Sequence, residues 1–257
     1  MKVLIAYDGS VCSDNAIVDL RRAGLPTVAE AIVLSVAEMS PRAASIPVGA
    51  LAVGPGLILA DGMESEESCE DELRTAKTVA YQGADRLRSD FPGWKIDTEA
   101  WVYAPGSAIA RKAHAWKPDL IVVGSHGRSG ISRWALGSVS QYVLHHVTCS
   151  VRISRHRLHS QARSIHLLIG VDESHNSRLA AEAVAKRNWP AGTEARVVGV
   201  LDSRIAVAAA TTLEGTIPVV IDDEYRRRMS AAVHEATKVL KESGLLSTPS
   251  SARRQAG

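Results

Sequence analysis

Short apolar runs alternate with longer segments of helical periodicity over the first 153 residues of the chain. The runs of strand length predict strands near residues 2–7, 31–37, 95–102, 119–124 and 149–153. Apolar residues at helical spacing predict helices near residues 13–23, 64–90, 106–116 and 138–146. Because parallel strands covered on both faces read as continuous apolar runs, the alternation indicates an α/β fold with helices on both faces of a parallel sheet.

The chain also repeats its own opening segment. Residues 2–38 align without a gap to residues 166–202, so that Asp8 pairs with Asp172 and Ser10 with Ser174. Such self-similarity indicates a duplicated domain. In the second copy the apolar pattern predicts strands near residues 165–171 and 195–201, and a helix near residues 222–243 with Gly244 as its C-cap.

The second copy is shorter than the first in this sequence. A counterpart of the Gly124 segment would fall beyond the last residue, so we expect the copy to lack a phosphate loop and its fourth and fifth strands. We expect one complete domain at residues 1–153 and a basic linker at residues 154–163. A partial second copy with two strands and two helices then follows at residues 164–244, and a disordered tail at residues 245–257.

A glycine-rich segment follows the apolar run of residues 119–124. It reads Gly124-Ser125-His126-Gly127, and Gly137-Ser138 follows after nine more residues. We expect Gly124 and Gly127 to permit positive φ angles and close backbone approach, and Ser138 to cap the helix that follows. An anion at such a place meets free amides and the positive end of the helix dipole, so the segment predicts a site for nucleotide phosphates.

The spacing Gly-x2-Gly-x9-Gly-Ser resembles the ATP-binding signature of the universal stress protein family. This resemblance implies an open five-stranded sheet of order 3-2-1-4-5, in which Asp8, at the end of the first strand, faces the same crevice as the Gly124 loop. It further implies that Asp8 lies against the adenosine moiety, that Val36 meets the base through its backbone, and that Mg²⁺ or Mn²⁺ accompanies the phosphates of ATP, ADP or AMP. The residues that match the phosphate-contacting segment are Gly124, Ser125, His126, Gly127, Gly137, Ser138 and Val139.

Three of these residues also have a simpler interpretation. Asp8 precedes Gly9 and suits a turn, Val36 suits the core of the sheet, and His126 suits a loop residue that faces solvent. The chain departs from the family pattern at Ala6, where many nucleotide-binding members have proline. We expect that difference to alter packing more than chemistry.

Composition and charge narrow the possible partners. The formal net charge of +2 gives no electrostatic reason for nucleic-acid binding, and no apolar segment has the length of a membrane span. The three cysteines, Cys12, Cys69 and Cys149, are odd in number and lack metal-ligand spacing, which favours free thiols, no metal site and a cytoplasmic location.

The leading hypothesis is therefore a nucleotide-binding regulatory protein of the stress response. No lysine of the Walker type follows the glycines, so efficient hydrolysis is not expected, although Arg128 and Arg133 leave slow ATPase or phosphotransfer activity open. A nucleotide-independent interaction protein is the third hypothesis. We also expect a homodimer joined through the edge strand at residues 149–153.

Overall fold

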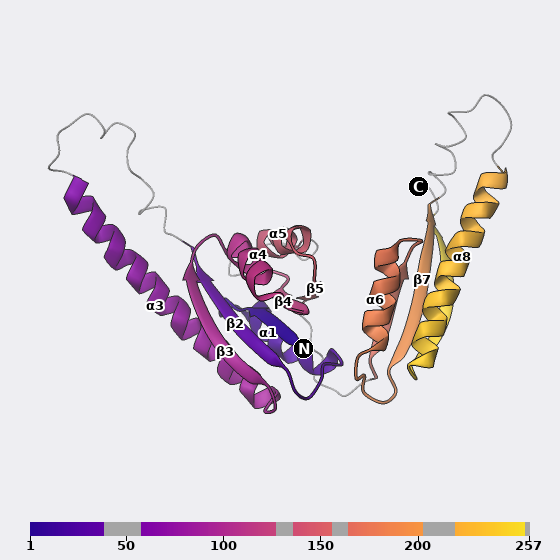
Figure 1. Cartoon of the computed structure of the whole chain (residues 1–257), viewed down its shortest axis with the longest axis horizontal. Helices are drawn as coiled ribbons and strands as arrows, with labels where there is room; N and C mark the ends of the chain where they lie inside the picture. Colours follow the sequence, from indigo (N-terminus) through magenta and orange to yellow (C-terminus); the bar gives the residue numbers. More distant parts are fainter. Residues whose placement is uncertain (39–57, 127–135, 156–163, 203–218, 255–257) are drawn as a thin grey trace, which may run out of the picture. The chain divides into compact units, whose positions relative to one another are not determined.

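The computed structural model describes residues 1–38, 58–126, 136–155, 164–202 and 219–254. The chain forms two compact units, which are described separately below (Figure 1). The first unit holds residues 1–21 and 26–160, and the second holds residues 22–25 and 161–257.

The first unit is built on a five-stranded parallel sheet of order β3-β2-β1-β4-β5, which confirms the predicted fold class and strand order. Its strands lie within one or two residues of the predicted ranges: β1 (Lys2–Ala6), β2 (Glu30–Ala37), β3 (Lys95–Val102), β4 (Leu120–Gly124) and β5 (Ser150–Ser154). The central strand β1 pairs in parallel with β2 on one side and with β4 on the other, so the strand order reverses between β1 and β4.

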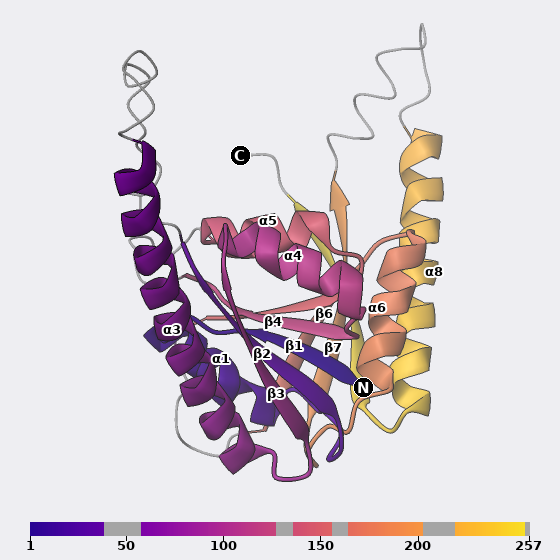
Figure 2. The ribbon, with the colours of Figure 1, turned by 60° about the vertical axis from the view of Figure 1, so that its left-hand side comes forward.

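Helices cover both faces of this sheet (Figure 2). On one face, Ile109 of α4 (Pro105–Trp116) and Val143 of α5 (Ser138–His146) pack with Leu4 and Leu34. The buried residues Val3 and Ile5 alternate with Leu4 along β1 and therefore point to the opposite face. That face is covered by α1 (Val11–Asp19), which continues into a 3₁₀ turn (Leu20–Arg22), and by α3 (Ile58–Asp90).

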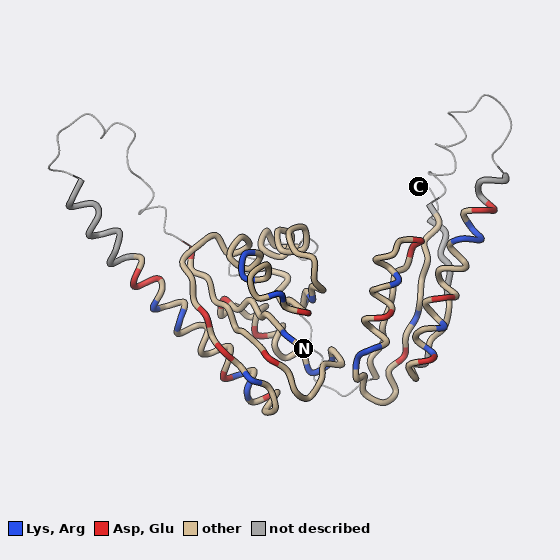
Figure 3. The backbone as a smooth tube through the Cα atoms, viewed as in Figure 1, with Lys and Arg blue, Asp and Glu red and all other residues tan. Residues whose placement is uncertain are grey.

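Helix α3 begins at residue 58, earlier than the predicted start at residue 64. Acidic and basic residues are interspersed along the described part of α3, and they are likewise mixed along α8 (Figure 3). Two ion pairs join residues three apart on α3, Asp71 with Arg74 and Asp85 with Arg88. These pairs are exposed, and they contribute little to stability.

The second unit has a three-stranded parallel sheet of order β6-β7-β8, with β6 (His166–Val171), β7 (Glu194–Asp202) and β8 (Leu246–Arg254). The helices described in this unit, α6 (His175–Ala185) and α8 (Val219–Glu242), pack on one face of the sheet, where Ala181 and Val233 meet Ile169 and Val197 in a single buried cluster. Helix α8 ends as predicted, because Gly244 has φ +86° and the Leu245 N–H donates to the Leu240 carbonyl at 3.1 Å.

The prediction of a disordered tail after residue 244 was wrong. Strand β8 pairs in parallel with β7 along its whole length, from Leu246 opposite Glu194 to Arg254 opposite Asp202. The segment is rich in serine and has no alternation of apolar and polar residues, so its sequence does not predict a strand. The strand forms through backbone pairing with β7. Its start is held by a buried bond, in which the Ser247 hydroxyl donates to the Thr237 carbonyl at 3.1 Å.

Candidate functional site

The residues predicted to form the site meet where β1 and β4 end. Both strands run in the same direction, and each is followed by a turn or loop that leads into a helix, α1 after β1 and α5 after β4. A methyl group placed on Gly124 would lie only 3.0 Å from the carbonyl carbon of Cys12 in α1. The start of α1 and the end of β4 are therefore in contact at the reversal of strand order, which is where open parallel sheets bind ligands.

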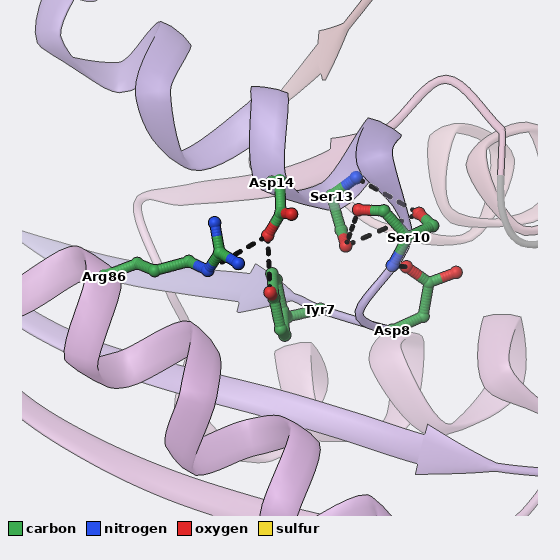
Figure 4. Close-up of polar contacts among 6 residues, drawn as sticks. All are labelled: Tyr7, Asp8, Ser10, Ser13, Asp14 and Arg86. Carbon is green, nitrogen blue, oxygen red and sulfur yellow. Dashed lines mark hydrogen bonds and ion pairs between the residues drawn. The ribbon is translucent and has the colours of Figure 1, made fainter.

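Asp8 forms a tight turn between β1 and α1 (Figure 4). Its Oδ1 accepts a hydrogen bond from the Ser10 N–H at 2.9 Å, and Gly9 has φ +76°. Ser10 then caps α1, because its hydroxyl accepts from the Ser13 N–H at 3.2 Å. This geometry matches the turn-forming interpretation of Asp8 and leaves its predicted role toward adenosine as a prediction.

The same turn occurs in the second unit. Asp172 Oδ1 accepts from the Ser174 N–H at 2.9 Å, and the Ser174 hydroxyl accepts from the Ser177 N–H at 3.2 Å. The hydrogen bonds from Ser174 lower the pKa of the Asp172 carboxyl. The turn therefore forms in a unit whose described residues include no counterpart of the Gly124 loop.

A polar network beside Asp8 was not predicted from the sequence. The Tyr7 hydroxyl donates to Asp14 Oδ1 at 2.5 Å, and Arg86 Nε lies 3.3 Å from the same oxygen (Figure 4). Gly83 of α3 makes room for the tyrosine, since a methyl group there would lie 2.7 Å from the ring. Burial, and then the hydrogen bond to Asp14, raise the pKa of Tyr7 to about 12. The network ties α1 and α3 to the end of β1.

The described ends of the phosphate loop are held by hydrogen bonds. The Ser125 N–H donates to the Ser154 carbonyl at 2.9 Å, and the Gly137 N–H donates to the Ser125 carbonyl at 2.7 Å. Ser140, a buried residue of α5 that the sequence analysis missed, donates its hydroxyl to the Gly124 carbonyl at 2.6 Å. Gly127 lies outside the described residues.

The expectation of a positive φ at Gly124 was wrong. Gly124 is the last residue of β4, and the described glycines with positive φ are Gly9, Gly24, Gly192 and Gly244. The residue needs to be small rather than left-handed, because the backbone of Cys12 occupies the space that a side chain would need.

The first turn of α5 has no side-chain cap. Its N-cap is Gly137, and Ser138 is the first helical residue, so the prediction that Ser138 caps the helix was wrong. The first N–H groups of an α-helix have no partner within the helix, and here the N-cap Gly137 makes no side-chain hydrogen bond to those of Ser138 and Val139. An anion seated at this end would accept hydrogen bonds from these amides and meet the positive end of the helix dipole.

His126 and Val36 differ in how they fit their predicted roles. His126 Nδ1 lies 3.2 Å from the Ser125 hydroxyl, while its Nε2 is buried and has no hydrogen-bond partner among the described residues, which does not suit a residue that faces solvent. Val36 is half-buried and packs against the cluster that holds Leu34 and Ile109, as a core residue does. Its backbone role remains a prediction.

The described residues include no group of three or more His, Cys, Asp or Glu side chains placed to hold a metal ion. A search of the same residues finds no helix that is both long and apolar enough to span a membrane.

Two curated relatives resemble parts of the chain. A universal stress protein of Synechocystis is 35% identical over 91 residues, and this match covers 35% of the present chain and 58% of the relative. The chain thus spans less than two thirds of that relative. A universal stress protein of Methanocaldococcus jannaschii is 29% identical over 152 residues, which cover 59% of the chain and 80% of the relative.

Among solved structures, a universal stress protein from Archaeoglobus fulgidus aligns with 99% of the chain and 79% of its own length, at a TM-score of 0.55 and 17% identity. That likeness concerns the fold alone. The model of the universal stress protein family matches residues 1–155, which include every strand of the first unit and both ends of the Gly124 loop. The chain belongs to the universal stress protein family.

Proposed function

We propose that the first unit binds an adenine nucleotide, with ATP as the expected form, and that the chain acts as a nucleotide-responsive regulator in the stress response. The observation that carries the proposal is the uncapped start of α5, placed beside Gly124 at the reversal of strand order. Backbone amides at a helix start suit phosphates, and the glycine spacing of the family signature supports the same ligand.

In this proposal each site residue has a defined role. The amides of Ser138 and Val139, with the Gly124–Gly127 segment, hold phosphate oxygens. Asp8 accepts a hydrogen bond from the adenosine moiety, and the backbone of Val36 meets the base. By extension of the register that pairs Ala6 with Leu34, Asp8 lies level with Val36 on the neighbouring strand, which supports their joint contact with one nucleoside.

A divalent cation would enter this site together with the nucleotide. Because no cluster of metal-ligating side chains occurs among the described residues, Mg²⁺ or Mn²⁺ would be held by phosphate oxygens and water, as Mg²⁺ commonly is in nucleotide sites. Bound there, the cation would neutralise phosphate charge. The Asp8 carboxylate and the amides of α5 would orient the nucleotide around it.

We also propose that two first units join through β5 (Ser150–Ser154). This strand lies at the edge of the described sheet and pairs only with β4 there. Charge on an edge strand often prevents pairing, but Arg152 forms an ion pair with Asp19 of α1, at 2.7 Å from Nη2. Its charge is therefore balanced within the unit.

We further propose that the chain works in a reducing compartment such as the cytoplasm. All three cysteines of the chain are free thiols, which supports this location.

Titration calorimetry of ATP into Asp8→Ala and Asp172→Ala chains tests the nucleotide site. Asp8→Ala removes one hydrogen bond to the ligand, worth about 0.5–1.5 kcal/mol, so the affinity should fall by up to roughly tenfold. Asp172→Ala is the matched control, because it removes the same turn bond in the second unit. It should leave the affinity unchanged, and equal losses in the two variants would contradict the proposed site.

A further inference from the structure

An exposed aromatic side chain lies at the carboxyl end of β3. Tyr103 comes directly after the last residue of this strand, and it is 46% exposed. Its N–H donates to the Ala37 carbonyl at 2.9 Å, so the backbone pairing between β2 and β3 continues as far as this residue. Tyr103 therefore lies at the same edge of the first sheet as the proposed nucleotide site, where the parallel strands end.

The ring of Tyr103 projects to the side of the sheet that α4 and α5 cover. Side chains alternate between the two faces of a strand, and Trp101, two residues earlier, packs against the buried cluster on that side. Val36 of β2 packs against the same cluster and lies opposite Trp101. Tyr103 and Val36 thus face the same side of the sheet from neighbouring strands.

The contacts of the proposed nucleotide follow the order of the strands along this edge. The phosphates lie at β4 and the start of α5, the nucleoside lies at Asp8 after β1, and the base meets Val36 of β2. The next strand is β3, about 4.8 Å further on. Because Val36 lies opposite Trp101, Tyr103 extends two residues, or about 6.5 Å, beyond the level of Val36. A base that rests on the end of β2 therefore has Tyr103 beside it.

The backbone of Tyr103 is held on both sides. The bond to Ala37 fixes its N–H, and the next residue, Ala104, is the extended N-cap of α4 with φ −67° and ψ 118°. Pro105 is the first helical residue, and a proline restricts the residue before it to extended backbone. A ring presented from such a fixed backbone loses little conformational freedom when a ligand packs against it.

The chemistry of this position suits the flat face of a nucleotide base. Aromatic side chains stack on bases, and a purine offers a larger face than a pyrimidine. Small-molecule sites combine apolar walls with a few polar groups, and here the half-buried Val36 and Trp101 provide apolar surface next to Tyr103. We propose that Tyr103 packs its ring against the base of the bound nucleotide and gives the site a preference for purines. This inference rests on the proposed function of the first unit.

Calorimetric titration of ATP, UTP and inorganic tripolyphosphate into variants of the full chain tests the contact. Tyr103→Ala should lower the affinity for ATP by about tenfold or more, because stacking on the base is lost. The affinity for tripolyphosphate, which has no base, should stay unchanged, and the preference for ATP over UTP should shrink. Tyr103→Phe should bind ATP like the wild type, since it keeps the ring and removes only the hydroxyl. Circular dichroism checks that each variant is folded.

Tyr81→Ala is the matched control. Tyr81 is 56% exposed on α3, which covers the opposite face of the sheet. The substitution removes a similarly exposed ring outside the proposed base contact, so the affinity for ATP should stay unchanged.

The possible results separate this inference from the proposed function. A wild-type chain that binds no ATP would refute both. If the wild type binds ATP and Tyr103→Ala binds it equally tightly, the proposed site stands and the tyrosine contact is refuted. Equal losses of affinity for ATP and tripolyphosphate in Tyr103→Ala, or a loss in Tyr103→Phe as large as that in Tyr103→Ala, would also overturn the contact, because the ring face would then not be what binds the base.

Discussion

Removing the Ser140 hydroxyl tests how the phosphate loop is held. The hydroxyl donates to the Gly124 carbonyl at 2.6 Å, and Ser140 is only 2% exposed. Ser140→Ala therefore deletes a hydrogen bond and leaves a carbonyl without this donor in a place that water does not readily reach. We expect a loss of about 1–3 kcal/mol in the free energy of unfolding of the first unit.

The size of this loss can be read in a thermal melt. For a unit of this length, each kcal/mol lowers the melting temperature by about 2–4 °C. Tryptophan fluorescence mainly reports the first unit, because four of the five tryptophans, Trp94, Trp101, Trp116 and Trp134, lie within its residues. Affinity for ATP should fall in the same variant, since the end of β4 and the start of α5 are no longer joined by this bond.

Ser138→Ala is the matched control for stability. It makes the same change two residues earlier in the same helix, but the N-cap of α5 is Gly137 and no side-chain cap bond is lost. Its melting temperature should stay close to that of the wild-type chain. If Ser140→Ala melts like the wild type, or if both variants lose the same stability, the bond to Gly124 does not hold the loop.

Two further predictions concern Tyr7 and β5. The pKa of Tyr7 is raised from 10.0 to about 12, so the stability that its protonated form provides is complete below pH 10.0 and is lost as the pH rises toward 12. Urea unfolding should show this loss in the wild type and a smaller one in Tyr7→Phe, whereas equal losses would exclude Tyr7 as the cause. The proposed β5 contact predicts a dimer that Val151→Pro converts to a monomer by sedimentation, because proline removes a backbone donor from the contact, and a dimer that survives Val151→Pro would exclude this contact.

Much of the fold could be predicted because buried parallel strands have a simple pattern. The five strands of the first unit appear in the sequence as continuous apolar runs. Strands β6 and β7 could be predicted as well, because residues 166–202 align with residues 2–38, which contain β1 and β2. Strand β8 could not be found in the same way, because backbone pairing with β7 defines it and its own residues are mostly polar. A strand that forms mainly through backbone pairing with a neighbouring strand cannot be recognised from its amino-acid composition.

The site was predictable only in outline for a related reason. Glycine spacing locates the loop, but contacts between elements decide what each residue does. Ser140 reaches Gly124 across 16 residues, and Asp14 meets Arg86 from another helix. Whether Gly137 or Ser138 caps α5 depends on backbone angles, since Gly137 has the extended conformation of an N-cap and Ser138 is already helical. No spacing rule determines such angles.

The central claim is that the first unit binds an adenine nucleotide, and mass spectrometry of the ligand that the purified full chain releases on denaturation tests it most directly. ATP is then titrated by calorimetry into the same preparation after the ligand has been removed. The account predicts that an adenine nucleotide is released, and that ATP rebinds at one site per chain, because in the described part of the chain only the first unit has a helix start like that of α5 beside a loop like that of Gly124. A preparation that releases no adenine nucleotide and gives no heat with ATP, ADP or AMP would contradict it.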